Sequence, residues 1–281
     1  MTLPLRAAFG RYAHTAPLLD GERRSPLLDL RFEPVAPISR AFAPMVRQGR
    51  FDASEMAIAT FLMAKAAGKP LVLLPVALAA RFQEGALLCR ADGPVRGPAD
   101  LAGRRIGVRA YSQTTGMWLR GVLAESFGLR PEAMRWVTFE DAHLAEYRDP
   151  PFCERAPAGA ELAAMLRRGE IDAAIFGNEL PEDPAFRPVF PDPEAAGEAF
   201  RARYGCMPVN HLAVVRQEIA ERHPEAVAEL VRLLASPALP HGRAALWPAI
   251  ALASRWCAEQ GLTPRVLPPE EVWAGLPAGV G

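Results

Sequence analysis

The sequence predicts an α/β fold built from two lobes. Short apolar runs alternate along the chain with segments whose apolar residues recur at helical spacing, a pattern typical of α/β architecture. The chain has 281 residues, of which 50% are hydrophobic. This length exceeds the commonest size of one domain and fits two compact lobes. Glycines follow several helical segments, where the left-handed backbone of a helix end favours them.

Six apolar runs are predicted to be strands. Each is short, is bounded by polar or turn-forming residues, and contains enough apolar side chains to be buried in a sheet. In chain order they cover residues 3–9, 71–76, 105–108, 134–139, 171–176 and 209–215.

Helices are predicted where apolar residues share one face. Pro44 disfavours a regular helix in the first of these segments, whereas Pro224 suits a helix start, where its missing N–H costs nothing. Pro248 is expected in the first turn of the last helix. The expected helices cover residues 38–48, 55–67, 114–127 and 161–168, a segment from residue 224, and residues 244–259.

The charge balance argues against a nucleic-acid or membrane partner. The 32 lysines and arginines balance the 32 aspartates and glutamates, whereas nucleic-acid binders usually carry a basic excess. No apolar run approaches the ~20 residues of a membrane span. Arg6 and Arg11 interrupt the N-terminal apolar stretch in which a signal peptide would need a continuous run. The expected location is the cytoplasm, or the periplasm if an export signal precedes this sequence.

Neither a metal nor a cofactor is predicted. The cysteines show no CxxC spacing and are expected to be small buried thiols in a reducing compartment. The ionisable run 140–149 contains His143 and Glu146, which could share a helix face, but a solvated, ion-paired segment is favoured over a metal site. Nucleotide-binding and GxSxG motifs are absent. The four cysteines are Cys89, Cys153, Cys206 and Cys257.

Small hydroxyl residues or a turn precede three expected helix starts. Helix N-termini carry unpaired N–H groups and partial positive charge, so several directed at one crevice would hold a carboxylate or phosphate. Taken singly, each hydroxyl is more simply an N-cap. The positions are Ser54, then Ser112 with Thr114 and Thr115, and the loop around Gly177–Asn178.

Five segments spread over nearly the whole chain carry a family resemblance. They are FDASEMAIATFLMAKAAG (51–68), PADLAGRRIGVRAYSQTTGMWLRGVLAESFGL (98–129), MLRRGEIDAAIFGN (165–178), VFPDPEAAGEAFRARYGCMPVNHLAVV (189–215) and EQGLTPRVLPPEEVW (259–273). Together they resemble the 4,5-dihydroxyphthalate decarboxylase family, which shares its fold with the type II periplasmic solute-binding proteins. The resemblance implies two lobes joined by hinge crossings, with a ligand in the interlobe cleft. The first lobe would hold residues 1–86 and 206–281, and the second residues 87–205.

The chain departs from the family pattern in two places. The family carries arginines and a histidine where this chain reads Ala80 to Glu84, and an arginine near Gly177 to Glu179. Fewer cations weaken a site for a dicarboxylate, because a buried carboxylate needs paired charge or several N–H donors. The expected ligand is therefore a small hydroxylated aromatic or heterocyclic carboxylic acid.

His211 is the first candidate for catalysis. Decarboxylating such an acid requires a proton donor for the ring carbon, and an imidazole titrates near neutrality. His211 lies in the apolar run VNHLAVV at a position resembling a family one, although a hydrogen-bonded core histidine is an equally good interpretation. Glu55 is the second catalytic candidate, at an expected helix start where it could also simply favour the helix dipole.

Substrate-binding candidates come from the loops after strands and from helix starts. Open α/β sheets place ligands after their first strand. Arg120 is expected to lie too deep along its helix to touch a ligand. The candidates are Tyr12, His14, Thr15, Ser54, Arg81, Tyr111, Ser112, Thr114, Thr115, Arg148 and Asn178.

Two functions fit this reading. The first is a cofactor-independent decarboxylase or related lyase acting on a hydroxylated aromatic acid. The second is a solute-binding protein of an ABC-type transporter, which would capture a small carboxylic acid without turnover. A homo-oligomer is compatible with either function.

Overall fold

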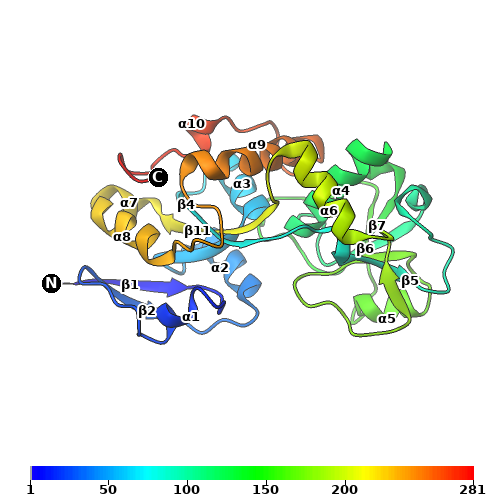
Figure 1. Ribbon diagram of the computed structural model, residues 1–281, viewed down its shortest axis with the longest axis horizontal. Helices are drawn as coiled ribbons and strands as arrows, with labels where there is room; N and C mark the ends of the chain where they lie inside the picture. Colours follow the sequence, from blue (N-terminus) through cyan, green and yellow to red (C-terminus); the bar gives the residue numbers. More distant parts are fainter. Residues whose placement is uncertain (1) are drawn as a thin grey trace. The chain divides into compact units, whose positions relative to one another are not determined.

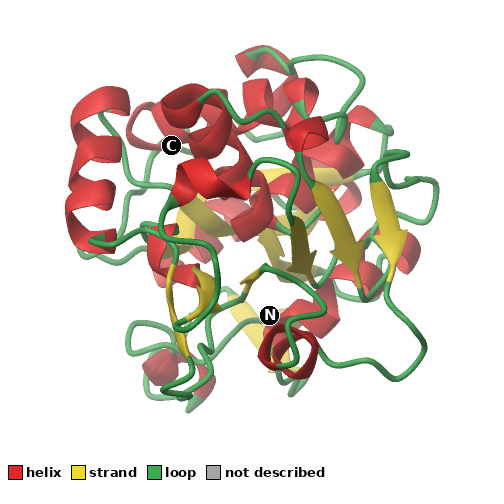
Figure 2. Cartoon of the chain, turned by 90° about the vertical axis from the view of Figure 1, so that its right-hand side faces the viewer, coloured by secondary structure: helices red, strands yellow, loops and turns green. Residues whose placement is uncertain are grey.

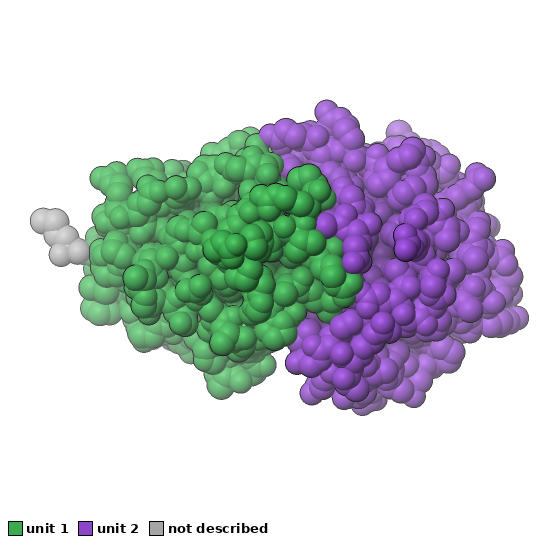
Figure 3. Space-filling view, turned by 90° about the horizontal axis from the view of Figure 1, so that it is seen from above, with its two compact units in different colours: residues 1–80, 209–255, 263–281 green, residues 81–208, 256–262 purple. Residues whose placement is uncertain are grey.

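The computed structural model describes residues 2–281, which form two compact units. The first unit contains residues up to 80, residues 209–255 and residues 263–281 (Figure 3). The second contains residues 81–208 and 256–262. The units thus change at 80/81 and 208/209, close to the lobe borders expected at 86/87 and 205/206.

The first unit is built on a five-stranded sheet in the order β2-β1-β3-β11-β4 (Figure 1). β3 lies between β1, to which it is parallel, and β11, to which it is antiparallel. The carboxyl end of β3 is therefore at the same edge of the sheet as the loop that follows β1 and the first residues of β11. The strands are β1 (Leu3–Ala8), β2 (Leu28–Phe32), β3 (Ala53–Ala57), β4 (Leu71–Ala80) and β11 (Val209–Arg216).

Helices enclose this sheet. Gly49 ends α2 in the left-handed conformation expected of it, and Pro224 occupies the first position of α8. The helices are α1 (Ala16–Leu19), α2 (Phe42–Gln48, after a 3-10 turn at Ile38–Ala41), α3 (Ile58–Ala66), α7 (Gln217–Arg222), α8 (Pro224–Leu234), α9 (Arg243–Glu259) and α10 (Pro269–Val272). Residues 256–259 of α9 belong to the second unit.

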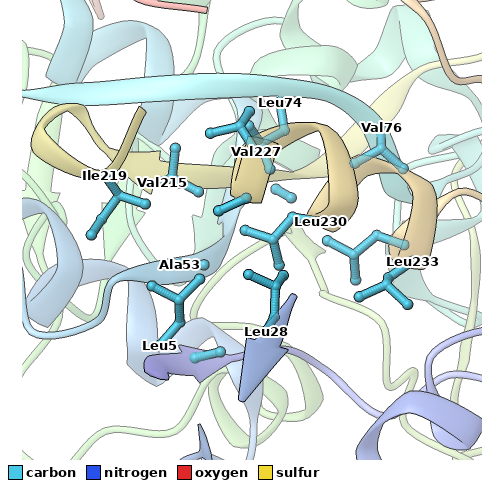
Figure 4. Close-up of a cluster of buried hydrophobic side chains, with 14 of the residues drawn as sticks. Leu5, Leu28, Ala53, Leu74, Val76, Val215, Ile219, Val227, Leu230 and Leu233 are labelled. Atoms are coloured by element: carbon cyan, nitrogen blue, oxygen red, sulfur yellow. The ribbon is translucent and has the colours of Figure 1, made fainter. Parts of the chain in front are cut away.

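One face of the sheet packs on α7 and α8 (Figure 4). Along β4, every second residue from Val72 to Leu78 is in this core, which is the period-2 pattern of a strand. Along α8, Val227, Leu230 and Leu234 recur at helical spacing on the buried face. Burying each such side chain contributes roughly 1.5–3 kcal/mol, and this core fixes the strands that carry the site described below.

The second unit contains a six-stranded sheet in the order β10-β5-β9-β6-β7-β8, whose strands lie side by side among helices (Figure 2). Gly128 ends α4 in the left-handed conformation. The strands are β5 (Leu87–Arg90), β6 (Arg105–Val108), β7 (Arg135–Thr138), β8 (Cys153–Arg155), β9 (Ala173–Ile175) and β10 (Phe186–Pro188). The helices are α4 (Thr114–Phe127), α5 (Leu162–Arg167) and α6 (Pro193–Tyr204), with 3-10 turns at Glu84–Ala86, Pro98–Leu101 and Pro131–Ala133.

Three sequence-based expectations about elements are wrong. Residues 55–67 do not form one helix, because 53–57 are strand β3 and the helix begins at Ile58. Every residue from 51 to 64 is buried, so this stretch has no polar face by which a strand and a helix could be told apart. Pro248 lies inside α9 rather than in its first turn. No helix follows Gly177–Asn178.

Within residues 2–281, no helix combines the length and the apolar character needed to span a bilayer.

Candidate active site

Three elements of the first unit bring together Glu55, His211 and Tyr12. Glu55 lies on β3, and its neighbour across the sheet on β11 is Ala213, while His211 lies opposite Ala57. Residues two apart on a strand point to the same face, so Glu55 and His211 are diagonal neighbours on one face. Tyr12 comes from the loop after β1, the strand on the other side of β3.

The Glu55 carboxylate is fully buried and accepts three hydrogen bonds. The Gly10 N–H donates to Oε2 at 2.8 Å, and the Tyr12 hydroxyl donates to Oε1 at 2.5 Å. The Nδ1 atom of His211 lies 2.6 Å from the same Oε1. A buried carboxylate needs such donors to offset its desolvation, and together they fix the side chain in one orientation.

His211 is held by one ring nitrogen and leaves the other available. With the Glu55 carboxylate as acceptor, Nδ1 carries a proton. The His211 side chain is 13% exposed. Its Nε2 makes no hydrogen bond within residues 2–281. Phe42 packs edge-on against the ring, with centroids 5.1 Å apart. β11 also changes register against β4 on both sides of His211, an irregularity that re-aims a side chain. His211 can therefore donate or accept a proton at Nε2.

The loop after β1 is tied down by Thr15. Its hydroxyl accepts a hydrogen bond from the Tyr12 N–H at 2.8 Å and donates to the Gly10 carbonyl at 2.6 Å. Thr15 is fully buried, so its hydroxyl serves the loop backbone. Through these bonds Thr15 holds the loop in which Tyr12 and the Gly10 N–H bond to Glu55, and its contact with a ligand stays a prediction.

His14 stacks on Tyr12 next to this cluster. The ring centroids are 5.4 Å apart and the planes differ by 4°. Burial lowers the pKa of His14, partly opposed by the Glu55 charge, and its buried Nε2 has no hydrogen-bond partner among residues 2–281. Burial, followed by the Glu55 charge, raises the pKa of the Tyr12 phenol well above its usual value. Both rings are therefore uncharged at neutral pH.

Ser54 and Glu55 lie on a strand, whereas the sequence predicted that they start a helix. Both belong to β3 instead of a helix start, and the Ser54 hydroxyl donates to the Glu55 carbonyl at 2.8 Å. Ser54 is fully buried and points to the opposite face from Glu55, because alternate strand residues face opposite sides. Ser54 therefore caps no helix and does not line the site with Glu55.

The remaining predicted substrate-binding residues belong to the second unit. Arg81 donates through Nη2 to the Gly177 carbonyl at 2.8 Å, and burial lowers its pKa. Arg148 is exposed and donates to the carbonyls of Ala145 and Tyr147. Asn178 is exposed. Four residues at the start of α4 are buried together, namely Tyr111, Ser112, Thr114 and Thr115.

The start of α4 is not capped by a hydroxyl. Its N-cap residue is Gln113, whose side chain makes no capping hydrogen bond, so the expected N-cap role of the neighbouring hydroxyls is wrong. The segment 140–149 is irregular rather than helical, so His143 and Glu146 share no helix face. Within residues 2–281, no group of three or more His, Cys, Asp or Glu side chains is arranged to hold a metal ion.

Sequence reasoning missed a buried polar group in the second unit. Arg120 on α4 is fully buried, and its Nη1 has no hydrogen-bond partner among residues 2–281. The hydroxyl of Tyr147 is likewise buried and unpartnered there. The position of Arg120 on a largely apolar predicted helix was a usable signal for its burial.

Comparison with known proteins supports the family resemblance. The family model described as NMT1/THI5 like matches residues 28–148. The 4,5-dihydroxyphthalate decarboxylase of Comamonas testosteroni is 31% identical over 252 residues, which cover 82% of this chain and 73% of that protein. The enzyme of the same name from Pseudomonas putida is 32% identical over 217 residues, covering 71% of this chain and 82% of that protein.

Solved structures support the fold. The periplasmic aliphatic sulphonate binding protein SsuA of Escherichia coli matches with a TM-score of 0.55 and 15% identity, covering 98% of this chain and 83% of that protein. The alkanesulfonate-binding protein SsuA of Xanthomonas axonopodis pv. citri, bound to MOPS, matches with a TM-score of 0.55 and 20% identity. The match covers 98% of this chain and 84% of that protein. These matches confirm the predicted two-lobed α/β fold of the type II periplasmic binding proteins. By its sequence similarity to the two decarboxylases, the chain belongs to the 4,5-dihydroxyphthalate decarboxylase family.

Proposed function

We propose that the protein is a carboxy-lyase that removes a carboxylate from a hydroxylated aromatic or heterocyclic acid, with His211 as the proton donor. The observation that carries this proposal is the buried Glu55 carboxylate, which holds Nδ1 of His211 at 2.6 Å, while Nε2 has no partner among residues 2–281. The names of the relatives from Comamonas testosteroni and Pseudomonas putida support the reaction class.

The proposed step exchanges a carboxylate for a proton. Nε2–H of protonated His211 delivers its proton to the ring carbon that bears the carboxylate, and a hydroxyl on the ring supplies the electron density. The bond between this carbon and the carboxylate then breaks, CO2 leaves, and the bonding pair restores the aromatic ring. His211 is left neutral and regains a proton from solvent.

Glu55 is the positioning residue in this proposal. A carboxylate on Nδ1 fixes the ring orientation and stabilises the imidazolium, which is the form that donates. The second oxygen accepts the Gly10 N–H, and the Tyr12 hydroxyl shares the oxygen that holds the imidazole. These bonds keep the negative charge of Glu55 in place while the proton moves at the far side of the ring.

His14 is proposed to contact the substrate. Its unpartnered, buried Nε2 lies on a ring stacked against Tyr12, which itself bonds to Glu55. A buried polar atom without a partner costs free energy, and a substrate hydroxyl would remove that cost. A neutral imidazole suits a phenolic hydroxyl because it can donate or accept.

The reaction is tested with purified protein and a panel of mono- and dihydroxylated aromatic acids. We expect CO2 release from at least one acid, unchanged by a chelator since no cofactor is proposed. An acid that raises the melting temperature and is recovered intact would instead support the alternative, a binding protein that captures the acid for an ABC-type transporter. Action in the cytoplasm, a role in aromatic-compound degradation and a homo-oligomeric state are further proposals, which fractionation, growth tests and sedimentation would check.

A further inference from the structure

Gly10 lies in the loop after β1, directly against the ring of Tyr12. A Cβ added to Gly10 would lie 2.8 Å from both Cζ and the hydroxyl oxygen of Tyr12, and 2.9 Å from Cε2. Non-bonded carbon atoms pack at about 3.5–4.0 Å. The phenol therefore occupies the space that a side chain at residue 10 would need.

The backbone of Gly10 does not itself require glycine. Its φ lies outside the left-handed region, whereas Gly49 and Gly128 end their helices in that conformation. Glycine serves either where the chain adopts a positive φ or where another group approaches the backbone closely. At Gly10 the second reason applies, and the group that approaches is the end of the Tyr12 side chain.

The same loop holds both oxygens of Glu55. The Gly10 N–H donates to Oε2 at 2.8 Å, and the Tyr12 hydroxyl donates to Oε1 at 2.5 Å. Oε1 is also the atom that lies 2.6 Å from Nδ1 of His211. The phenol thus reaches this shared oxygen from a place that a side chain at residue 10 would fill.

Hydrogen bonds hold the backbone of this loop against a larger residue. The buried Thr15 hydroxyl donates to the Gly10 carbonyl at 2.6 Å and accepts from the Tyr12 N–H at 2.8 Å. The Tyr12 carbonyl accepts from the N–H groups of Thr15 and Ala16 at 3.1 and 2.8 Å. The Tyr12 ring is half-buried and can turn to another rotamer. A Cβ at residue 10 therefore moves the phenol away from Oε1 and leaves the backbone in place.

We propose that Gly10 is a positioning residue of the site, because its missing side chain lets the Tyr12 phenol hold Oε1 of Glu55 in line with His211. This inference rests on the proposed role of His211 as the proton donor. When the phenol is displaced, Oε2 keeps the Gly10 N–H, but Oε1 loses one of its two donors and the carboxylate can turn out of line with Nδ1. The hydrogen bond at Nδ1 sets which nitrogen of the imidazole carries the proton, so Nε2 is then no longer held as the reacting atom.

The first test observes the Nδ1 proton of His211 by NMR, in protein without substrate. A proton held between an imidazole and a buried carboxylate is protected from exchange with water and gives a resolved signal, which is assigned by its loss in His211→Gln. We expect this signal in the unchanged protein and its loss in both Gly10→Ala and Tyr12→Phe. Tyr12→Phe keeps the ring and lacks the hydroxyl, so it removes the same donor without adding a Cβ.

The second test compares the two substitutions in the decarboxylase assay. Each should lower kcat by about tenfold or more, because the proton donor is no longer aligned. Gly10→Ala/Tyr12→Phe should be no slower than the slower single variant, because both changes remove one hydrogen bond. The matched control is Gly97→Ala, since nothing lies within 4 Å of a Cβ there and the backbone is extended. It should keep both the His211 signal and kcat.

A background without the Tyr12 ring tests the contact itself. We expect Gly10→Ala to melt below the unchanged protein. Tyr12→Ala removes the group that excludes a Cβ, so Gly10→Ala/Tyr12→Ala should melt at the same temperature as Tyr12→Ala. If Gly10→Ala failed to fold, this pair would still test the contact, and the signal of Tyr12→Phe would still test the role of the phenol.

The proposal is overturned if either Gly10→Ala or Tyr12→Phe keeps the Nδ1 signal, or if the unchanged protein lacks it. A lower melting temperature for Gly10→Ala/Tyr12→Ala than for Tyr12→Ala would overturn it too, because the added Cβ would then meet something other than the ring. The NMR and melting experiments need no turnover. A protein that releases no CO2 but loses the signal in both variants contradicts the decarboxylase proposal and supports the placement of Glu55 by Gly10 and Tyr12.

Discussion

Glu55 joins the residues of the site, because its buried carboxylate accepts hydrogen bonds from the Gly10 N–H, the Tyr12 hydroxyl and the His211 imidazole. Two donors share one of its oxygens, so the imidazole and the phenol are coupled through a single acceptor. The sequence predicted all three side chains as site residues, but only the pairing of β1, β3 and β11 brings them together. Thr15 and Ser54 were predicted from their polarity near a strand or helix end, and Arg148 from its place in the ionisable run 140–149. Each donates a hydrogen bond to the backbone.

Replacing Glu55 by glutamine tests its positioning role. Glutamine keeps the size but loses the charge that stabilises the imidazolium, so kcat should fall by roughly 10²-fold or more with little change in KM. Steady-state kinetics measures both constants.

The matched control for that substitution is Glu84→Gln. Glu84 is also buried, with its carboxylate bonded to the Gln83 N–H, and burial raises its pKa. It contacts none of the three site residues, so kcat should stay as it is. A Glu55→Gln enzyme with the same kcat as Glu84→Gln would contradict the role assigned to Glu55.

His14 should make stability depend on pH. Its folded pKa lies below the usual 6.5 because of burial, so the unfolded chain binds the proton more readily. Its contribution is therefore fully present above about pH 6.5 and is lost as pH falls through the folded pKa. In His14→Phe, which keeps an aromatic ring against Tyr12, the free energy of unfolding should decline less between about pH 7.5 and about pH 5.

Urea denaturation across that pH range measures the effect. Since the other histidines are common to both proteins, the difference between the two curves isolates His14. Parallel curves for His14→Phe and the unchanged protein would show that His14 is not buried in its neutral form.

Among the elements, local signals sufficed where an apolar run had clear boundaries. Residues 105–108 and 114–127 form a strand and a helix with the predicted bounds, because polar residues precede the strand and Gly128 ends the helix. They failed at residues 51–64, which are buried throughout. In this stretch residues 53–57 form a strand because they pair with β1 on one side and β11 on the other. Such long-range pairing leaves no periodicity in the sequence.

Helix α4 depends on a close contact at Gly121. A Cβ there would lie 2.1 Å from the ring of Trp256, so Gly121→Ala must displace a fully buried indole. We expect a loss of about 1–3 kcal/mol in the free energy of unfolding, or more if the ring cannot move. Chemical denaturation measures it.

Gly97→Ala is the control for Gly121→Ala, because nothing lies within 4 Å of a Cβ at Gly97 and its backbone is extended. Its unfolding free energy should stay within about 0.5 kcal/mol of the unchanged protein. If both alanine variants had the same stability, the packing of Trp256 against α4 would be wrong.

For the molecule as a whole, length and alternation of elements predicted two α/β lobes, and the resemblance predicted the family. The structure divides the chain at 80/81 and 208/209 and places residues 256–262 in the second unit. The hydrogen bond between Arg120 and Gln260 could not be predicted, since the two residues are 140 positions apart in the sequence. The partners of a buried charge become known only when the packing around it is known.

The central claim is that Nε2 of His211 delivers the proton that replaces the carboxylate. The most direct measurement compares the rate of CO2 release by His211→Gln with that of the unchanged enzyme at saturating substrate, with His241→Gln as the control because His241 is exposed. We predict a fall of roughly 10²–10⁴-fold for His211→Gln, with substrate affinity nearly unchanged and full activity in the control. Undiminished CO2 release by a folded His211→Gln protein would contradict the mechanism.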